Sequence, residues 1–261
     1  MFKTPSHTRT AGFTLVELVL ALVVIGVISA FMLSISSSVN NFSKLATTKV
    51  RMQNIAKQAR QYFLAHRKQA LAAPDNRVPV QSGALNLEGK YRLDGWGQFF
   101  RYLLSDNTDP QKITGFLLNG NSVHLGAVII SRGGNQQFDY KTSTSNGNTI
   151  FTLAGDDIIV GINFNQEATE IALEELKTLQ DKSDGVDFST LDAQEQTATG
   201  GAADYIVTTY SLNSDYKNDP WGKPYLWGDQ GNYPSNTNRR YHRFFSQGPD
   251  KTRDTDDDLL R

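Results

Sequence analysis

Aspartates close to the C-terminal end are the residues of this sequence whose type and spacing best suit the binding of a ligand. After Ser246 and Gly248, five of them fall within nine residues: Asp250, Asp254, Asp256, Asp257 and Asp258. A calcium ion takes six to eight oxygen ligands, which carboxylates, hydroxyls and the backbone carbonyls of a curled loop can supply. The D-x-D-x-D-G spacing of an EF-hand is absent. A calcium-binding loop and a solvated acidic tail, paired in part with Lys251, Arg253 and Arg261, both remain open on these residues.

The sequence contains no arrangement of residues that indicates an enzyme. It has no cysteine, which excludes disulfides, thiol nucleophiles and zinc–thiolate sites. Its four histidines are scattered, and no G-x-S-x-G, H-E-x-x-H or phosphate-binding glycine motif is present. A net charge of −1 gives no argument for nucleic acid as a partner, and the basic, aromatic stretch at 238–245 is interpreted as a strand with a basic flank. We therefore predict that the protein is not an enzyme and binds no nucleic acid.

A single carboxylate, Glu17, stands inside a strongly apolar N-terminal stretch. No charged residue occurs from Leu18 to Ser43, and the apolar part at 18–35 is close to the length of a bilayer-spanning helix. A carboxylate in such a helix is costly and needs a partner. A secretory signal peptide fits poorly, because no small-residue cleavage pattern follows; a plain membrane anchor and an assembly helix remain. If the chain were cut after Gly12, the new amino group of Phe13 could pair with Glu17 of the next subunit.

The residues that follow predict that the same helix continues beyond the bilayer. Apolar side chains recur at steps of three and four from Val39 to His66, and no proline occurs between Phe13 and Pro74. We expect one helix over about 13–72, transmembrane over 13–35 and amphipathic after that. His66 is interpreted as a residue of this helix and not as a catalytic group.

Beyond Pro74, short β-like runs and turn-forming residues predict small antiparallel sheets. Candidate strands lie at 99–104, 113–118, 123–131, 149–153, 205–212, 224–227 and 241–246. The block DGWGQFFRY at 94–102 is echoed by DPWGKPYLW at 219–227, with an acidic amphipathic helix expected at 165–185 between them. We therefore predict the fold class α+β, with the long helix packed on a globular part and two similar halves expected over 73–164 and 165–261. Trp96 and Trp221 are expected in the core.

The first of these halves has a weaker acidic loop than the second. Its carboxylates are Asp139, Asp156 and Asp157, and a polar insertion, KTSTSNGNT, separates the first from the other two. We expect this loop to be degenerate as a metal site, or satisfied by hydrogen bonds alone.

Two stretches resemble a known family. GFTLVELVLALVVIG resembles the prepilin signature of type IV pilins and type II secretion pseudopilins, although the late proline of many members is absent. The resemblance implies a leader of residues 1–12, cleavage after Gly12 by prepilin peptidase, N-methylation of Phe13 and a registering role for Glu17. DPWGKPY with the downstream acidic loop is similar to the C-terminal domain of the major pseudopilin of type II secretion, where a loop binds calcium. This resemblance favours calcium as a cofactor, with ligands from Ser246 and the five aspartates, although Lys251 stands where the family usually has glycine.

The residues and the resemblance together predict a structural subunit of a type II secretion pseudopilus or a type IV pilus. Its helix would sit in the inner membrane, with the globular part in the periplasm. Its expected partners are other pilin-like subunits, the peptidase, and an inner-membrane assembly platform with its ATPase. The alternative is a membrane-anchored, calcium-stabilised adhesin or binding module displayed on a pilus.

Overall fold

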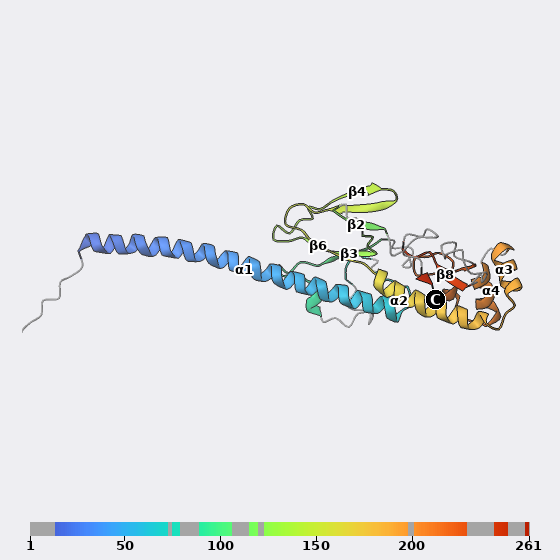
Figure 1. Ribbon diagram of the computed structural model, residues 1–261. Coiled ribbons are helices and arrows are strands. Elements are labelled where there is room, and N and C mark those ends of the chain that lie inside the picture. Colours follow the sequence, from blue (N-terminus) through green and yellow to red (C-terminus); the bar gives the residue numbers. More distant parts are fainter. Residues whose placement is uncertain are drawn as a thin grey trace, which may run out of the picture. The chain divides into compact units, whose positions relative to one another are not determined.

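The computed structural model describes residues 14–72, 75–78, 89–105, 115–119, 123–197, 201–228, 243–249 and 259–260. The chain divides into two compact units, Met1–Ala46 and Thr47–Arg261. The first contains the apolar part of the N-terminal helix, and the second contains the rest of that helix with all the other described elements (Figure 1). The fold is α+β, as predicted.

The N-terminal helix α1 extends over Leu15–Ala65 and is continuous, as its sequence predicts. In the second unit it buries one stripe of side chains at three- and four-residue steps: Thr48, Met52, Ile55, Ala56, Ala59 and Phe63. The helix ends at Ala65 and not near Ala72. The backbone turns at Arg67 and Lys68, whose φ angles are +40° and +70°, and the chain then enters the interior of the unit.

The first half of the second unit holds two small sheets. One is antiparallel in the order β1-β3-β6, from strands Arg101–Leu104, Ala127–Ser131 and Ile158–Ile162. The other is mixed in the order β2-β5-β4, from strands Phe116–Leu118, Asn148–Thr152 and Lys141–Ser145. Residues of β1, β3 and β6 share one core cluster with the buried stripe of α1. The prediction of a long helix packed on a small sheet is therefore confirmed.

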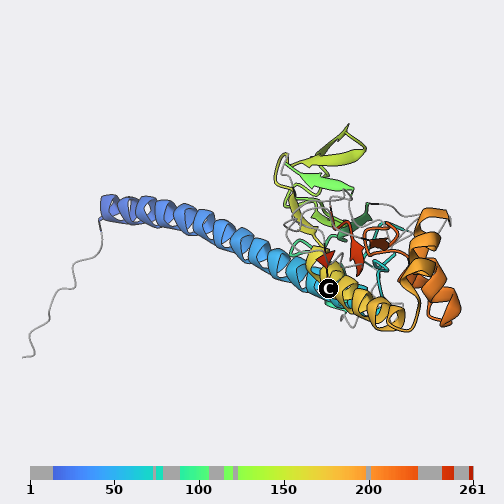
Figure 2. The same cartoon turned by 45° about the vertical axis from the view of Figure 1, so that its right-hand side comes forward.

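The second half begins with α2, Asn165–Ser183, close to the predicted helix. Two shorter helices follow, α3 at Phe188–Thr197 and α4 at Gly201–Thr209, which lie side by side (Figure 2). A third sheet, in the order β7-β8-β9, is antiparallel and consists of Leu226–Gly228, Arg243–Ser246 and Leu259–Leu260. Short 3-10 helices occupy Gly89–Arg92 and Ser214–Lys217.

The predicted strand at 205–212 is wrong, because most of it is helix α4. Its Ile-Val-Thr-Thr run has strand-like β-branched residues, and that composition carried the prediction. The buried side chains of α4 are Ala202, Ala203, Ile206 and Val207, which is a helical spacing. Packing of this stripe against α2, α3 and β7 overrides the local preference.

The turn at Asp94 is held by a set of hydrogen bonds to one buried carboxylate. Its Oδ1 accepts backbone N–H bonds from Trp96 (2.9 Å) and Gln98 (2.8 Å), and its Oδ2 accepts from the Ser131 hydroxyl at the end of β3 (2.7 Å). The Ser131 hydroxyl in turn accepts from the N–H of Gly133 at 3.3 Å. A single aspartate thus joins the turn before β1 to the loop after β3.

The turn at Asp219 repeats this set bond for bond. Its Oδ1 accepts from the N–H groups of Trp221 (3.1 Å) and Lys223 (2.8 Å), and its Oδ2 accepts from the Ser246 hydroxyl (2.7 Å). Ser246 accepts from the N–H of Gly248 at 3.1 Å. The two W-G blocks that are similar in sequence therefore have the same local structure.

The strand registers around the two turns also correspond. Ser131 lies opposite Ile158 in the β3–β6 pair, and Ser246 lies opposite Leu259 in the β8–β9 pair. The first turn contacts α1 through a bond from the N–H of Gly95 to the Thr48 hydroxyl, 2.8 Å long. The second contacts α2 instead, where the Trp221 indole donates to Asn165 at 3.3 Å. Trp221 is buried in the core, as predicted, while Trp96 is only half-buried.

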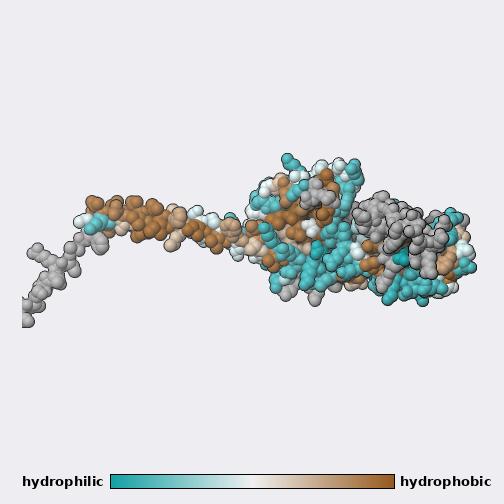
Figure 3. Space-filling model, in the orientation of Figure 1, coloured by the Kyte–Doolittle hydropathy of each residue, from teal (hydrophilic) through white to brown (hydrophobic). Residues whose placement is uncertain are grey.

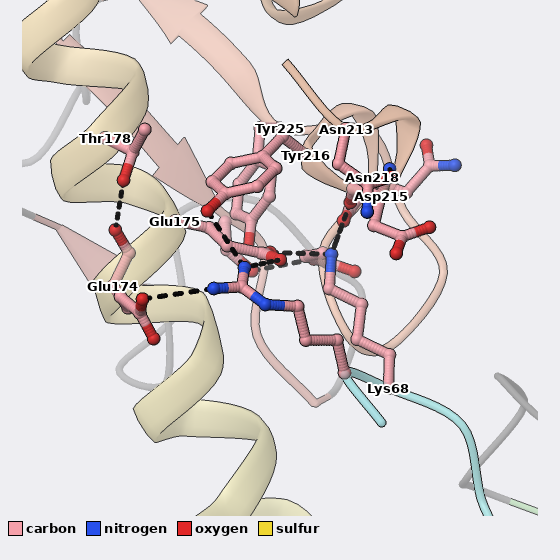
Figure 4. Close-up of polar contacts among 12 residues, drawn as sticks. Lys68, Glu174, Glu175, Thr178, Asn213, Asp215, Tyr216, Asn218 and Tyr225 are labelled. Atoms are coloured by element: carbon pink, nitrogen blue, oxygen red, sulfur yellow. Dashed lines mark hydrogen bonds and ion pairs between the residues drawn. The ribbon is translucent and has the colours of Figure 1, made fainter. Parts of the chain in front are cut away.

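A buried ion pair joins the segment after α1 to α2 (Figure 4). Lys68 Nζ lies 2.6 Å from Glu175 Oε2, with the two side chains 2% and 0% exposed. The Tyr225 hydroxyl donates to the same Glu175 oxygen at 2.6 Å, and the Lys68 ammonium also donates to the carbonyls of Asp215 and Asn218, both at 2.5 Å. Burial lowers the pKa of Lys68 and raises the pKa of Glu175, against their mutual attraction.

Candidate functional site

The first candidate site is the start of α1, where Glu17 caps its own helix. Its Oε2 accepts from the backbone N–H and from the hydroxyl of Thr14, both at 2.9 Å. In return, the N–H of Glu17 donates to the Thr14 hydroxyl at 3.3 Å. This reciprocal arrangement is a capping box of the form T-x-x-E. The T-x-x-E spacing is present in the sequence, whereas the resemblance assigns Glu17 a role in assembly only.

The predicted cleavage and methylation positions, Gly12 and Phe13, lie outside the described residues. The apolar residues of α1 that follow Glu17 are exposed without interruption as far as Phe42. Figure 3 shows the first part of this stretch as a nearly continuous hydrophobic surface, and paler and hydrophilic residues follow further along the helix. By length and composition α1 can cross a membrane, and it is the one such helix among the residues that the structure describes.

The predicted calcium loop in the second half is mostly outside the described residues. This applies to all five of its aspartates: Asp250, Asp254, Asp256, Asp257 and Asp258. Ser246 is described, and its buried hydroxyl donates to Asp219. Calcium binding by this loop therefore stays a prediction.

The first-half aspartates come together more closely than their sequence separation suggests. We refer to Asp139, Asp156 and Asp157 as the first-half acidic cluster; one carboxylate oxygen from each lies within 4.8 Å of the others. Asp139 precedes β4, while Asp156 and Asp157 precede β6. Between them the β4–β5 hairpin, which contains the polar insertion, turns the chain back on itself.

Asp157 has an oxygen that its surroundings leave without a partner. Its Oδ2 accepts the N–H groups of Asp139 (2.7 Å) and Tyr140 (2.8 Å). Its Oδ1 is buried and accepts no hydrogen bond, and the whole residue is 8% exposed. Burial, reinforced by the charges of Asp139 and Asp156, raises the pKa of Asp157. A buried, unpartnered carboxylate oxygen beside two further carboxylates suits a cation.

The loops around the first-half acidic cluster pack closely against its carboxylates. Asp156 Oδ2 accepts the N–H groups of Gly134 (2.5 Å) and Asn135 (2.9 Å). Gly155 has a φ of +61°, and a Cβ atom there would lie 2.2 Å from the Asp139 carboxylate. Hydrogen bonds hold the loops in place, but they do not use every carboxylate oxygen, so hydrogen bonds alone do not satisfy this loop. The residues fit a calcium ion, which would neutralise the mutual repulsion of the three carboxylates.

Comparison with known proteins matches one stretch of the chain. Residues 7–33 match the family described as the prokaryotic N-terminal methylation motif, a range that includes Gly12, Phe13 and Glu17. No curated protein and no solved structure matches the chain. The motif leads directly into the exposed apolar part of α1, a combination that fits membrane anchoring. The chain thus carries, at its N-terminus, the type IV pilin and pseudopilin signature followed by a long apolar helix.

Proposed function

We propose that this protein is a structural subunit of a type II secretion pseudopilus or a related type IV filament. The observation that supports this most is the methylation motif at 7–33, continued by an apolar helix whose side chains are exposed. The carriers of this signature are structural subunits and not enzymes. In the proposal, prepilin peptidase cleaves after Gly12 and methylates Phe13, and the mature helix then leaves the inner membrane to pack against other subunits.

The capping box explains how a subunit tolerates Glu17 before assembly. A carboxylate in lipid without partners costs several kcal/mol. Two donors from Thr14 satisfy one oxygen within the same chain. During assembly the carboxylate would approach the terminal ammonium of a neighbouring subunit, which offers a charged partner in place of a neutral one. The stronger bond would form only between correctly staggered helices, and this would give the filament its register.

The globular part would lie in the periplasm and face the neighbouring subunits. It contains two W-G turns, and each contacts a different helix. The globular part is therefore larger than that of a subunit with a single turn and helix would be. We infer a low-copy or tip position, because a larger subunit is harder to repeat at every step of a helical filament. The assembly platform and its ATPase would provide the energy for extraction.

Calcium is the cofactor in this proposal. The first-half acidic cluster would hold one ion, and the aspartates at 250–258 would hold a second. The ion would supply a positive charge that joins loops which otherwise repel one another. The melting midpoint of the full chain in detergent should rise when calcium replaces EDTA. Asp157→Asn should reduce this shift, while Asp181→Asn, at an exposed position on α2, should leave it unchanged. An equal shift in both variants would remove the first-half cluster from the proposal.

Assembly is tested by substitutions that separate charge from capping. Glu17→Gln keeps an acceptor for Thr14 but loses the charge, whereas Thr14→Ala loses the two hydrogen bonds of the hydroxyl and keeps the charge. We expect Glu17→Gln to insert in the membrane and be cleaved but not to enter filaments, and Thr14→Ala to assemble. Intact mass should show a chain that begins at Phe13 and carries one added methyl group. A mature chain that still begins at Met1, or a Glu17→Gln variant that assembles like wild type, would contradict the proposal.

A further inference from the structure

A polar cleft of about 340 Å³ lies beside β1 in the first half of the globular unit. The residues that give it its character are three arginines, two phenylalanines and one carboxylate: Arg77, Arg101, Arg132, Phe99, Phe138 and Asp75. Arg77 and Asp75 come from the segment after α1, Arg101 from β1, and Arg132 and Phe138 from the loop after β3. Segments far apart in the sequence thus concentrate three positive charges in a protein whose net charge is −1.

Each of the three guanidinium groups lies over one of the two aromatic rings. The Arg77 Cζ atom is 4.8 Å from the centroid of Phe99. The Cζ atoms of Arg101 and Arg132 are 5.1 Å and 4.5 Å from the centroid of Phe138. A guanidinium that packs its flat face on a ring keeps its N–H edge available and loses less freedom when that edge binds an anion.

No carboxylate balances these charges among the residues that the structure describes. Asp75 lines the cleft, but its Oδ1 accepts the backbone N–H of Arg77 at 3.1 Å and forms no ion pair there. Arg101 donates to the neutral hydroxyl of Tyr140 at 2.8 Å. The Nε of Arg132 is buried and has no hydrogen-bond partner. Two like charges on one ring are unfavourable, and an anion bound in the cleft would offset their repulsion.

We propose that this cleft binds carboxylates of an acidic peptide segment on a protein partner. A carboxylate matches the guanidinium fork through two parallel hydrogen bonds. The small volume suits one or two acidic side chains and not a helix or a duplex. A nucleic acid backbone would need a longer basic track, and the net charge of −1 gives no argument for one. This inference is independent of filament assembly through α1.

The test uses the full chain in a non-ionic detergent and a fluorescein-labelled hexaglutamate peptide, followed by fluorescence anisotropy. The peptide should bind with an affinity that falls as salt rises, and an uncharged hexaglutamine peptide should not bind. Arg77→Gln and Arg132→Gln should each weaken binding by roughly tenfold, the effect of one charge-assisted hydrogen-bonded contact. Arg132→Lys should also bind more weakly than wild type, because lysine keeps the charge but not the fork.

Lys177→Gln is the matched control, since it removes one positive charge from an exposed position on α2. It should leave the affinity nearly unchanged. Arg77 is exposed, so its variant should keep the wild-type melting midpoint and report on binding alone. The binding is measured with and without calcium, because the charge of the first-half acidic cluster beside Phe138 depends on whether it holds an ion. Binding of the peptide in either condition supports the proposal. Absence of binding in both, equal losses in Lys177→Gln and the arginine variants, or tighter arginine-dependent binding of a single-stranded oligonucleotide would overturn it.

Discussion

Replacing Lys68 by methionine should destabilise the globular unit strongly. The substitution removes the ammonium 2.6 Å from Glu175, whose side chain is 0% exposed. The buried carboxylate then loses its closest counter-charge and keeps only the Arg67 guanidinium, 4.0 Å away. Removal of one partner of a buried pair costs about 3–5 kcal/mol of unfolding free energy. For a unit of this size that corresponds to a melting midpoint lowered by about 6–20 °C.

The loss of stability in Lys68→Met should depend on pH. Burial raises the pKa of Glu175, and Lys68 is the main group that opposes the rise. In Lys68→Met the folded-state pKa of Glu175 therefore lies above its unfolded value. The penalty is present above the folded pKa and disappears as the pH falls toward the unfolded value. The difference in stability from wild type should shrink as the medium becomes more acidic.

Glu175→Gln should show the opposite dependence. Burial lowers the pKa of Lys68, and Glu175 is the main group that opposes this lowering. Without it, the ammonium is penalised below its folded pKa and the penalty is relieved as the pH rises through that value. The loss in this variant should therefore shrink toward alkaline pH, while Tyr225 can still donate to the amide oxygen.

Urea unfolding of the full chain in detergent, monitored by tryptophan fluorescence at several pH values, measures both slopes. The double variant Lys68→Met/Glu175→Gln removes both charges and should recover at least half of the loss of either single variant. Lys177→Met, at an exposed position, controls for the change in net charge. Parallel pH slopes for the two single variants, or a double variant as unstable as the sum of the two, would refute the reasoning.

Other consequences of the structure can be measured in the same way. Thr14→Ala should cost the start of α1 about 1 kcal/mol and speed amide exchange in its first turn, whereas Glu17→Gln should do so much less. Asp94→Asn and Asp219→Asn should each cost about 2–3 kcal/mol in chemical unfolding, and by similar amounts, because the two carboxylates accept the same three bonds. Gly155→Ala should lower the melting midpoint and abolish the part of the calcium response that Asp157→Asn abolishes, since its Cβ would meet Asp139; an unchanged midpoint would show that the loop relaxes freely.

Much of the architecture could be predicted because it depends on local patterns. The stripe at Met52, Ile55, Ala59 and Phe63 follows the helical period, and the W-G blocks carry their own turn chemistry. The point at which a helix ends was harder to predict. The end of α1 depends on Lys68 leaving the helix for a partner more than a hundred residues away, which no local signal near Ala65 announces.

The two clusters of charge in the first half could not be predicted from spacing. Asp139 meets Asp156 only because the chain between them forms the β4–β5 hairpin. The asparagines and glycine of this insertion are depleted in strands, which weakens the strand signal of its threonines. The arginine cleft depends on three segments that meet beside β1. Sites assembled from distant loops follow from topology, and composition alone does not provide the topology.

The correspondence of the two turns extends to the sequence positions of the aspartates that follow them. In both halves a serine ends the central strand and donates to the aspartate of its turn. Asp139 follows Ser131 by eight residues, and Asp254 follows Ser246 by the same number. Asp157 immediately precedes the strand that pairs with the first serine, and Asp258 stands at the same point before β9. The sequence therefore repeats the positions of two of the first-half carboxylates, and only three residues lie between Asp254 and Asp258. If one loop binds a cation, we expect the other loop to bind one as well. In each half, a buried aspartate would then hold the strands together, and a bound ion would hold the loop that follows.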